Sequence, residues 1–188
     1  MNNKTQMFGV ALLILTFVTA AILGLVAGPT SPLTWLLIAV LVSIPFLHRK
    51  LTSRQYVKWK DEYSVGIDSI DSQHRKLLSL INQLQTAVNF STGEEFERHA
   101  LDELVDYTKT HFIYEEGLME QHGYPEFEPH KQQHQQMIDM VEETLAGYQQ
   151  DKDTAMRNAA NFLKDWLINH INGTDKQYSA YLIDKGVK

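Results

Sequence analysis

The sequence contains no cysteine, which excludes disulfide bonds, thiolate metal sites and iron–sulfur clusters. Acidic residues are missing from its first 60 positions, which carry six lysines and arginines, whereas residues 61–188 carry 11 basic and 23 acidic residues. An acidic domain without a basic patch repels nucleic acid, so we exclude nucleic acid as a partner. Nor does the chain show a nucleophile triad, a catalytic acid/base pair or a phosphate-binding loop.

Charged residues are also missing from a long apolar run, Met7–Ala27. At about 1.5 Å per residue this run extends roughly 30 Å, the thickness of a bilayer core. A turn-like segment, Gly28–Pro32, separates it from a second and shorter apolar run, Leu33–Leu47, with Trp35 near the start where interfacial aromatic residues are common. The sequence therefore predicts a membrane anchor in residues 1–50, with one or two transmembrane helices (about 7–27 and 33–47) in contact with membrane lipid.

Five of the six basic residues in the first 60 positions follow the second apolar run at once, in residues 48–60. By the positive-inside rule this side of the membrane is the cytoplasm. Two spans would place both termini there, so we predict a location in the cytoplasmic (inner) membrane with the following domain facing the cytoplasm. A cleaved signal peptide, or one span with an interfacial helix, remains an alternative.

Residues 51–68 are interpreted as a juxtamembrane arm, and residues 69–188 predict an all-α, up-down-up-down antiparallel four-helix bundle. Apolar residues recur at helical spacing, and the short connections favour antiparallel neighbours. Ser69 is the expected N-cap of the first helix, Thr92 and Glu95 form the capping box expected for the second, and Gly123 is expected to end it. The helices are predicted at about 69–90, 92–121, 126–149 and 153–185.

Every predicted helix of the bundle carries histidine or carboxylate residues at spacings that suit metal binding. Residues four apart lie on one helix face, and a single such pair is often surface decoration, but here all four helices contribute. One pair is five apart, which needs a local widening such as a π-bulge near Gly173. The candidate ligands are His74, His111, Glu115, His130, His134, His170 and Asp175; His48, His99 and His122 lie outside the pattern.

Imidazole and carboxylate without thiolate suit iron, manganese or zinc, and seven ligands are too many for one tetrahedral zinc. Two octahedral ions share twelve ligand positions. Five histidines, two bridging carboxylates and a bridging oxide or hydroxide would fill all but one of them. A small ligand can bind at an open position beside a redox-active metal.

These motifs resemble the bacteriohemerythrins, the bacterial branch of the hemerythrin family, over about residues 59–182. The resemblance implies two non-haem iron ions with a bridging oxide or hydroxide. It makes His130, His134 and His170 the ligands of a full iron, His74 and His111 those of an open iron, and Glu115 and Asp175 bridging carboxylates. It also implies an oxygen pocket, although these residues fit an ordinary core as well: Leu77, Phe112, Trp166 and Ile171. The matching pieces include Gln73-His74, His111-Phe112-x-x-Glu115-Glu116, Gly123-Tyr124-Pro125, His130-x-x-x-His134 and Trp166-Leu167-x-x-His170.

The resemblance implies reversible dioxygen binding rather than enzymatic activity, for oxygen carriage, storage or delivery to a membrane oxidase or oxygenase. Two alternatives stay open. One is a membrane-tethered oxygen or iron sensor, although the chain carries no kinase, cyclase or methyl-accepting segment. The other is a di-iron enzyme of the peroxidase or nitric-oxide reductase type, although the Glu-x-x-His pairs of ferritin-like sites are missing.

Overall fold

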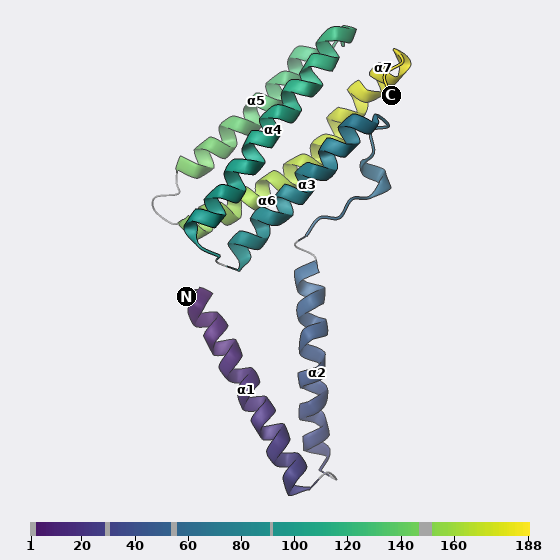
Figure 1. Cartoon of the computed structure of the whole chain (residues 1–188). Coiled ribbons are helices and arrows are strands. Elements are labelled where there is room, and N and C mark those ends of the chain that lie inside the picture. The colour runs from purple at the N-terminus through teal and green to yellow at the C-terminus, as the bar shows by residue number, and fades with distance from the viewer. Residues whose placement is uncertain (1–2, 29–30, 54–55, 91, 147–151) are drawn as a thin grey trace. The chain divides into compact units, whose positions relative to one another are not determined.

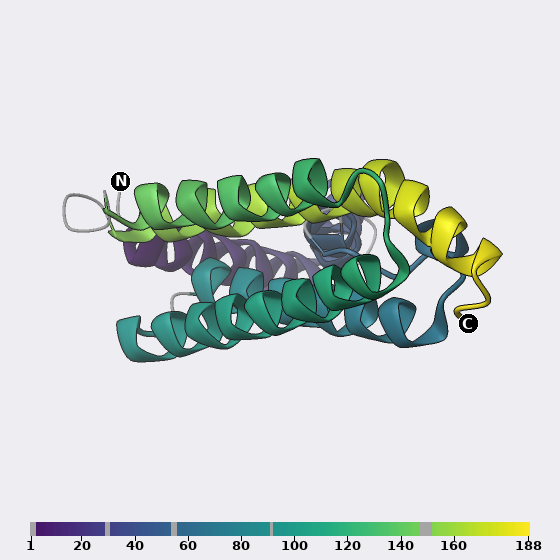
Figure 2. The same ribbon diagram turned by 90° about the horizontal axis from the view of Figure 1, so that it is seen from above.

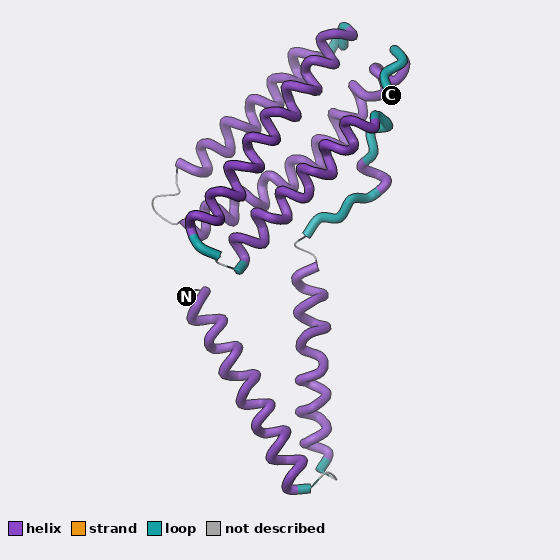
Figure 3. Tube along the Cα trace, viewed as in Figure 1, coloured by secondary structure: helices purple, strands orange, loops and turns teal. Residues whose placement is uncertain are grey.

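The computed structural model describes residues 3–28, 31–53, 56–90, 92–146 and 152–188, which form helices and connecting loops without any strand (Figure 3). The prediction of an all-α fold is confirmed. The chain divides into two compact units, Met1–Tyr56 and Val57–Lys188.

The first unit consists of two helices that pack along each other, α1 (Asn3–Ala27) and α2 (Pro32–Ser53) (Figure 1). They pack closely at Gly24, where an added Cβ atom would lie 2.5 Å from Thr34 Oγ1. A larger residue at this position would require the Thr34 side chain or the helices to shift. The predicted turn between them lies partly outside the described residues.

Phe8–Val26 is the one stretch of the described helices that is long and apolar enough to cross a membrane, and Pro32–Leu47 is shorter. The large apolar side chains of α1 are mostly exposed, for example Phe8 at 71% and Val26 at 83%. The stretch is therefore not the buried core helix of a soluble unit. A signal sequence near the N-terminus would have the same length and composition.

The helices of the second unit lie alongside one another in a bundle (Figures 1 and 2). They are α3 (Asp68–Asn89), α4 (Glu94–His122), α5 (Phe127–Ala146) and α6 (Lys152–His170), which a π-helical turn (Ile171–Asp175) joins to α7 (Lys176–Asp184). Helices α3 and α5 each pack against α4 and α6, and helices in contact run in opposite directions. This arrangement confirms the predicted antiparallel four-helix bundle.

Residues 57–67 belong to the second unit, because they form hydrogen bonds and packing contacts with α3. The backbone N–H of Val57 donates to Asn82 Oδ1 at 2.9 Å, and Asn82 Nδ2 donates to the Val57 carbonyl at 2.7 Å. The guanidinium of Arg75 lies 4.2 Å from the ring centre of Trp59. Further along, the side chains of Tyr63, Val65 and Ile67 are buried. A shortened protein must therefore keep the chain from Val57 onward.

The two N-terminal caps predicted for the first two bundle helices are wrong. The N-cap of α3 is Ile67 rather than Ser69, because the carboxylate of Asp71 reaches back to accept from the Val65 N–H at 2.8 Å and from the Ser64 hydroxyl at 2.5 Å. The N-cap of α4 is Gly93, with φ of +118° and no side-chain cap.

The capping box expected at the start of α4 is not formed, because the Thr92 hydroxyl turns back to the Ala87 carbonyl. The predicted end of α4 is confirmed by the left-handed Gly123, with φ of +66°. The end predicted for the next helix, near Gln149, lies outside the described residues.

Candidate metal centre

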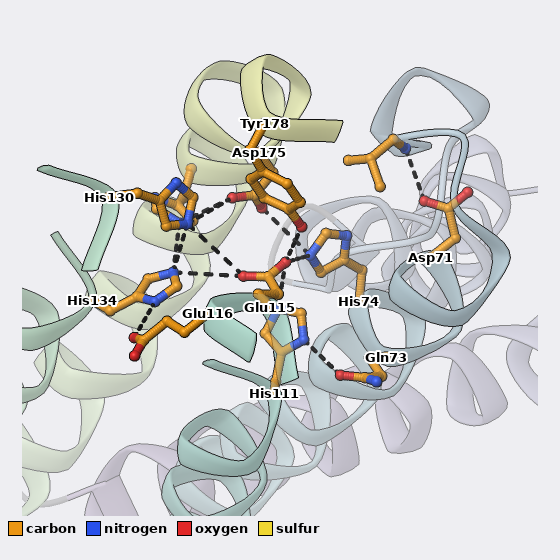
Figure 4. A network of polar contacts seen from close by, with 12 residues as sticks. Asp71, Gln73, His74, His111, Glu115, Glu116, His130, His134, Asp175 and Tyr178 are labelled. Atoms are coloured by element: carbon orange, nitrogen blue, oxygen red, sulfur yellow. Dashed lines mark hydrogen bonds and ion pairs between the residues drawn. The ribbon is translucent and has the colours of Figure 1, made fainter. Parts of the chain in front are cut away.

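The structure brings all seven predicted ligands together inside the bundle. Figure 4 shows these side chains from close by, with every ligand but His170 labelled. His74 comes from α3, His111 and Glu115 from α4, His130 and His134 from α5, His170 from the end of α6 and Asp175 from the π-helical turn. Their exposed fractions range from 0% to 5%. Four helices thus supply one buried cluster of polar groups.

The π-helical turn explains how two ligands five residues apart reach the same cluster. The turn widens the helix between His170 and Asp175, and His170 Nε2 lies 3.0 Å from Asp175 Oδ1. The widening that the spacing predicted is therefore present. A Cβ atom at Gly173 would meet nothing within 4 Å, so crowding does not require the glycine in this turn.

Glu115 faces two groups of histidines with its two oxygens. Oε1 lies 3.5 Å from His74 Nε2 and 3.3 Å from His111 Nε2. Oε2 lies 3.5 Å from His134 Nε2 and 4.0 Å from His130 Nε2. One carboxylate thus joins a two-histidine group to a three-histidine group.

Asp175 joins the same two groups in the same way. Its Oδ2 lies 3.4 Å from His74 Nε2, whereas its Oδ1 lies 3.0 Å from His170 Nε2 and 3.7 Å from His130 Nε2. The grouping is the one that the resemblance implies, with two histidines on one side and three on the other.

Burial and neighbouring charges set the pKa values of this cluster when it holds no ion. Burial lowers the pKa of His74, but Asp175 and Glu115 outweigh burial and raise it to about 9. Burial, His130 and His170 lower the pKa of His134 to about 2. His134 therefore keeps a free lone pair at neutral pH, as a metal ligand must.

Several buried polar atoms of the cluster have no hydrogen-bond partner. They are both ring nitrogens of His74, Nδ1 of His130, Oε2 of Glu115 and both carboxylate oxygens of Asp175. His134 Nε2 also lies 3.0 Å from His130 Nε2 and 3.1 Å from His170 Nε2, and one proton cannot serve both contacts. Because buried polar groups are normally satisfied, converging lone pairs of this kind fit metal cations.

Three residues around the ligands were not predicted to act at the site. Gln73 Oε1 lies 2.8 Å from His111 Nδ1, and Glu116 Oε1 lies 3.0 Å from His134 Nδ1. The Tyr178 hydroxyl donates to Glu115 Oε1. Gln73 and Glu116 adjoin ligands in the sequence, and Tyr178 follows Asp175 by one helical turn. Their closeness to predicted ligands in the sequence is the signal that could have pointed to them.

Two of the four predicted pocket residues stack on ligand histidines. Phe112 lies parallel to His134 with ring centres 3.6 Å apart, and Trp166 lies on His170 at 4.2 Å. Leu77 and Ile171 are buried, at 1% and 0% exposure. The aromatic pair thus covers the three-histidine group.

His99 and His122, which the pattern left out, do not belong to the two ligand groups. His99 is exposed, and His122 Nδ1 contacts the Leu118 carbonyl at 2.8 Å. The side chain of His48 is not among those that the structure describes.

An antiparallel four-helix bundle with two adjoining histidine groups and two shared carboxylates defines a class of bundle proteins that can hold a dinuclear metal centre. Residues 65–182 match the family model described as the Hemerythrin HHE cation binding domain. The chain therefore belongs to the hemerythrin family, which binds a non-haem di-iron centre.

Individual relatives agree with this assignment. A bacteriohemerythrin of Stenotrophomonas maltophilia (strain R551-3) is 39% identical over 121 residues, which cover 64% of this chain and 78% of the relative. One of Pseudomonas aeruginosa (strain LESB58) is 37% identical over 125 residues, which cover 65% and 79%. A crystal structure of wild-type hemerythrin superimposes with a TM-score of 0.59 at 27% identity, covering 67% of this chain and 97% of that one.

Proposed function

We propose that this protein binds dioxygen reversibly at two non-haem iron ions joined by a bridging oxide or hydroxide. His130, His134 and His170 would hold one iron, His74 and His111 the other, and Glu115 and Asp175 both. The observation that carries the proposal is that each carboxylate turns one oxygen to each histidine group. The group with only two histidines is the one that leaves room for an outside ligand.

The protein's own residues favour carriage of dioxygen over its consumption. A pair of ferrous ions, when bound, would supply the electrons with which dioxygen is held. Phe112 and Trp166 stack on His134 and His170 and cover one face of each ring. Burial and Glu115 raise the pKa of Tyr178 well above its ordinary value, and its hydroxyl is engaged with that carboxylate. A hydroxyl that retains its proton is a poor acid for cleaving an O–O bond.

The experiment that tests this proposal is an anaerobic oxygen titration of iron-loaded protein. We expect two irons per chain, a charge-transfer absorption that appears with oxygen, and loss of that absorption on degassing through repeated cycles. A chain beginning near Arg54 should behave in the same way, because it keeps residues 57–67 and every ligand. One irreversible oxidation per exposure, or steady turnover with a reductant, would overturn the proposal in favour of an enzyme.

We also propose that the first unit anchors the protein in the cytoplasmic membrane with the bundle in the cytoplasm. The support is the exposed apolar length of α1, the close pairing of α1 and α2 at Gly24, and the basic residues that follow the second apolar run. A carrier held there would deliver oxygen to a membrane oxidase or oxygenase.

Protease treatment of intact spheroplasts tests the orientation of the anchor. We expect the protein to sediment with membranes and residues 51–188 to resist protease until the cells are broken. A soluble reporter placed in the periplasm serves as the positive control for digestion. Cleavage of the bundle in intact spheroplasts would mean a single span or a cleaved signal, and would place the bundle outside the cytoplasm.

A further inference from the structure

All five histidines of the cluster turn the same ring atom inward. In four of them Nε2 lies within 3.5 Å of a carboxylate oxygen of Glu115 or Asp175. In His130 the corresponding distance is 3.7 Å. A neutral imidazole binds a metal through the nitrogen that carries no proton, so the ring proton must sit on Nδ1. A hydrogen-bond acceptor for the Nδ1 proton holds the ring in this tautomer and orientation.

Two rings of the cluster face such an acceptor. His111 faces Gln73 Oε1 at 2.8 Å and His134 faces Glu116 Oε1 at 3.0 Å. By contrast, Nδ1 of His74 and Nδ1 of His130 are buried without a partner. The two held rings fall one in each group, His111 among the two histidines and His134 among the three.

The two acceptors differ in charge. Gln73 offers a neutral amide oxygen, whereas Glu116 is an acid and, when ionised, offers a carboxylate. A hydrogen bond to a carboxylate is the stronger one and makes the imidazole a better electron donor to its metal. Glu116 also lies at the edge of the bundle, with 20% of its side chain exposed and Lys131 Nζ at 3.8 Å.

We propose that Gln73 and Glu116 are positioning residues that hold His111 and His134 with Nε2 toward the metal centre, and that the amide and the carboxylate make the two metal positions electronically unequal. The three-histidine position, with the better donor, holds ferric iron more firmly than the two-histidine position. The difference between the two metal positions rests on the proposed di-iron function. The positioning of the His111 and His134 rings does not, because it applies to the metal-free protein as well.

Glu116 further links this buried difference to the surface. It lines an open groove of about 870 Å³ between α4 and α5, together with Lys131, His134 and Phe112. The contact between Glu116 and His134 Nδ1 thus borders a groove that is open to solvent. The residue that sets the donor strength of His134 therefore lies at the surface of the bundle.

The positioning role is tested on the metal-free full-length chain by nitrogen-15 NMR of the histidine rings, which distinguishes Nδ1–H from Nε2–H forms. In the wild type we expect His111 and His134 to be fixed in the Nδ1–H form. Gln73→Leu should release His111 alone, and Glu116→Leu should release His134 alone. The matched control is Lys131→Met, which removes an ion pair of Glu116 and should leave both rings unchanged.

Iron-loaded chains test the same role by chelator competition under anaerobic conditions. The two leucine variants should bind iron about 10- to 100-fold more weakly, the usual loss when an outer partner of a ligand is removed. Glu116→Gln keeps an acceptor oxygen at this position and should keep two irons. Leucine variants with unchanged ring forms and unchanged iron affinity would overturn the positioning role.

The electronic difference between the two metal positions is tested by replacing each acceptor with its isosteric counterpart of the other charge. Gln73→Glu should lower the midpoint potential of the centre and Glu116→Gln should raise it, while Lys131→Met should shift it less than either. Shifts in the same direction, or none, would overturn the inequality. If the wild type takes up no iron, the proposed function fails, and the ring measurement on the metal-free chain still decides the positioning role.

Discussion

Replacing Glu115 with alanine is expected to leave the protein without iron at either metal position. Glu115 lies within 4.0 Å of four ligand histidines and turns a different oxygen to each group, so its loss weakens both groups at once. Removing an outer partner of a ligand costs about 10- to 100-fold in metal affinity, and removing a shared ligand should cost more than about 100-fold. Metal analysis of purified protein gives the answer directly.

Glu120→Ala is the matched control, because Glu120 lies on the same helix, five residues on, and is exposed. It should retain two irons per chain. Single-histidine variants refine the result: His74→Ala should impair the two-histidine position and His134→Ala the three-histidine position. Circular dichroism must show a helical bundle in each variant, so that loss of iron is not loss of fold. Normal iron content in Glu115→Ala would rule out Glu115 as a shared ligand.

Much of the bundle could be predicted because its signals are local and periodic. The apolar stripe on the first bundle helix recurs at helical spacing, and its members Leu77, Leu80, Ile81, Leu84 and Val88 are all buried. Even the irregular part was visible, because two ligand types five residues apart need a widened turn, and the structure has one. Patterns of this kind depend on few distant contacts.

Helix starts failed because distant or competing contacts decide them. Ser69 was expected to cap α3, but its hydroxyl instead accepts a hydrogen bond from Tyr114 on α4 at 3.0 Å, and Asp71 organises the chain before the helix. Before α4, the positive φ of Gly93 sets the start of the helix in place of a Thr92 cap.

The outer residues of the site were hidden for a related reason. A tyrosine one turn beyond a ligand resembles any core aromatic until the fold places its hydroxyl on Glu115. The amide of Gln73 finds His111 only because α3 and α4 pack side by side. Such contacts join residues 38 and 63 positions apart, beyond the reach of helical periodicity.

Replacing Trp166 with alanine is expected to speed the irreversible oxidation of the iron centre while leaving two irons in place. The indole lies parallel to His170 at 4.2 Å and packs edge-on against Phe112 at 5.9 Å, but it supplies no ligand. Its removal opens the cover over the three-histidine group, and water that enters favours charge separation and loss of the reduced state. The rate constant is measured from the decay of the charge-transfer absorption in air.

Trp59 provides the matched control for this experiment. It is a half-buried tryptophan like Trp166, but it packs against Arg75 and Tyr63 in the segment before α3. Both alanine variants should lose at most about 3 kcal/mol of stability, because large-to-small changes at fully buried sites cost about 3–5 kcal/mol. Only Trp166→Ala should oxidise faster than the wild type. Equal oxidation rates in the two variants would mean that the effect follows general loosening of the bundle, and the protective role of the Trp166 ring would be wrong.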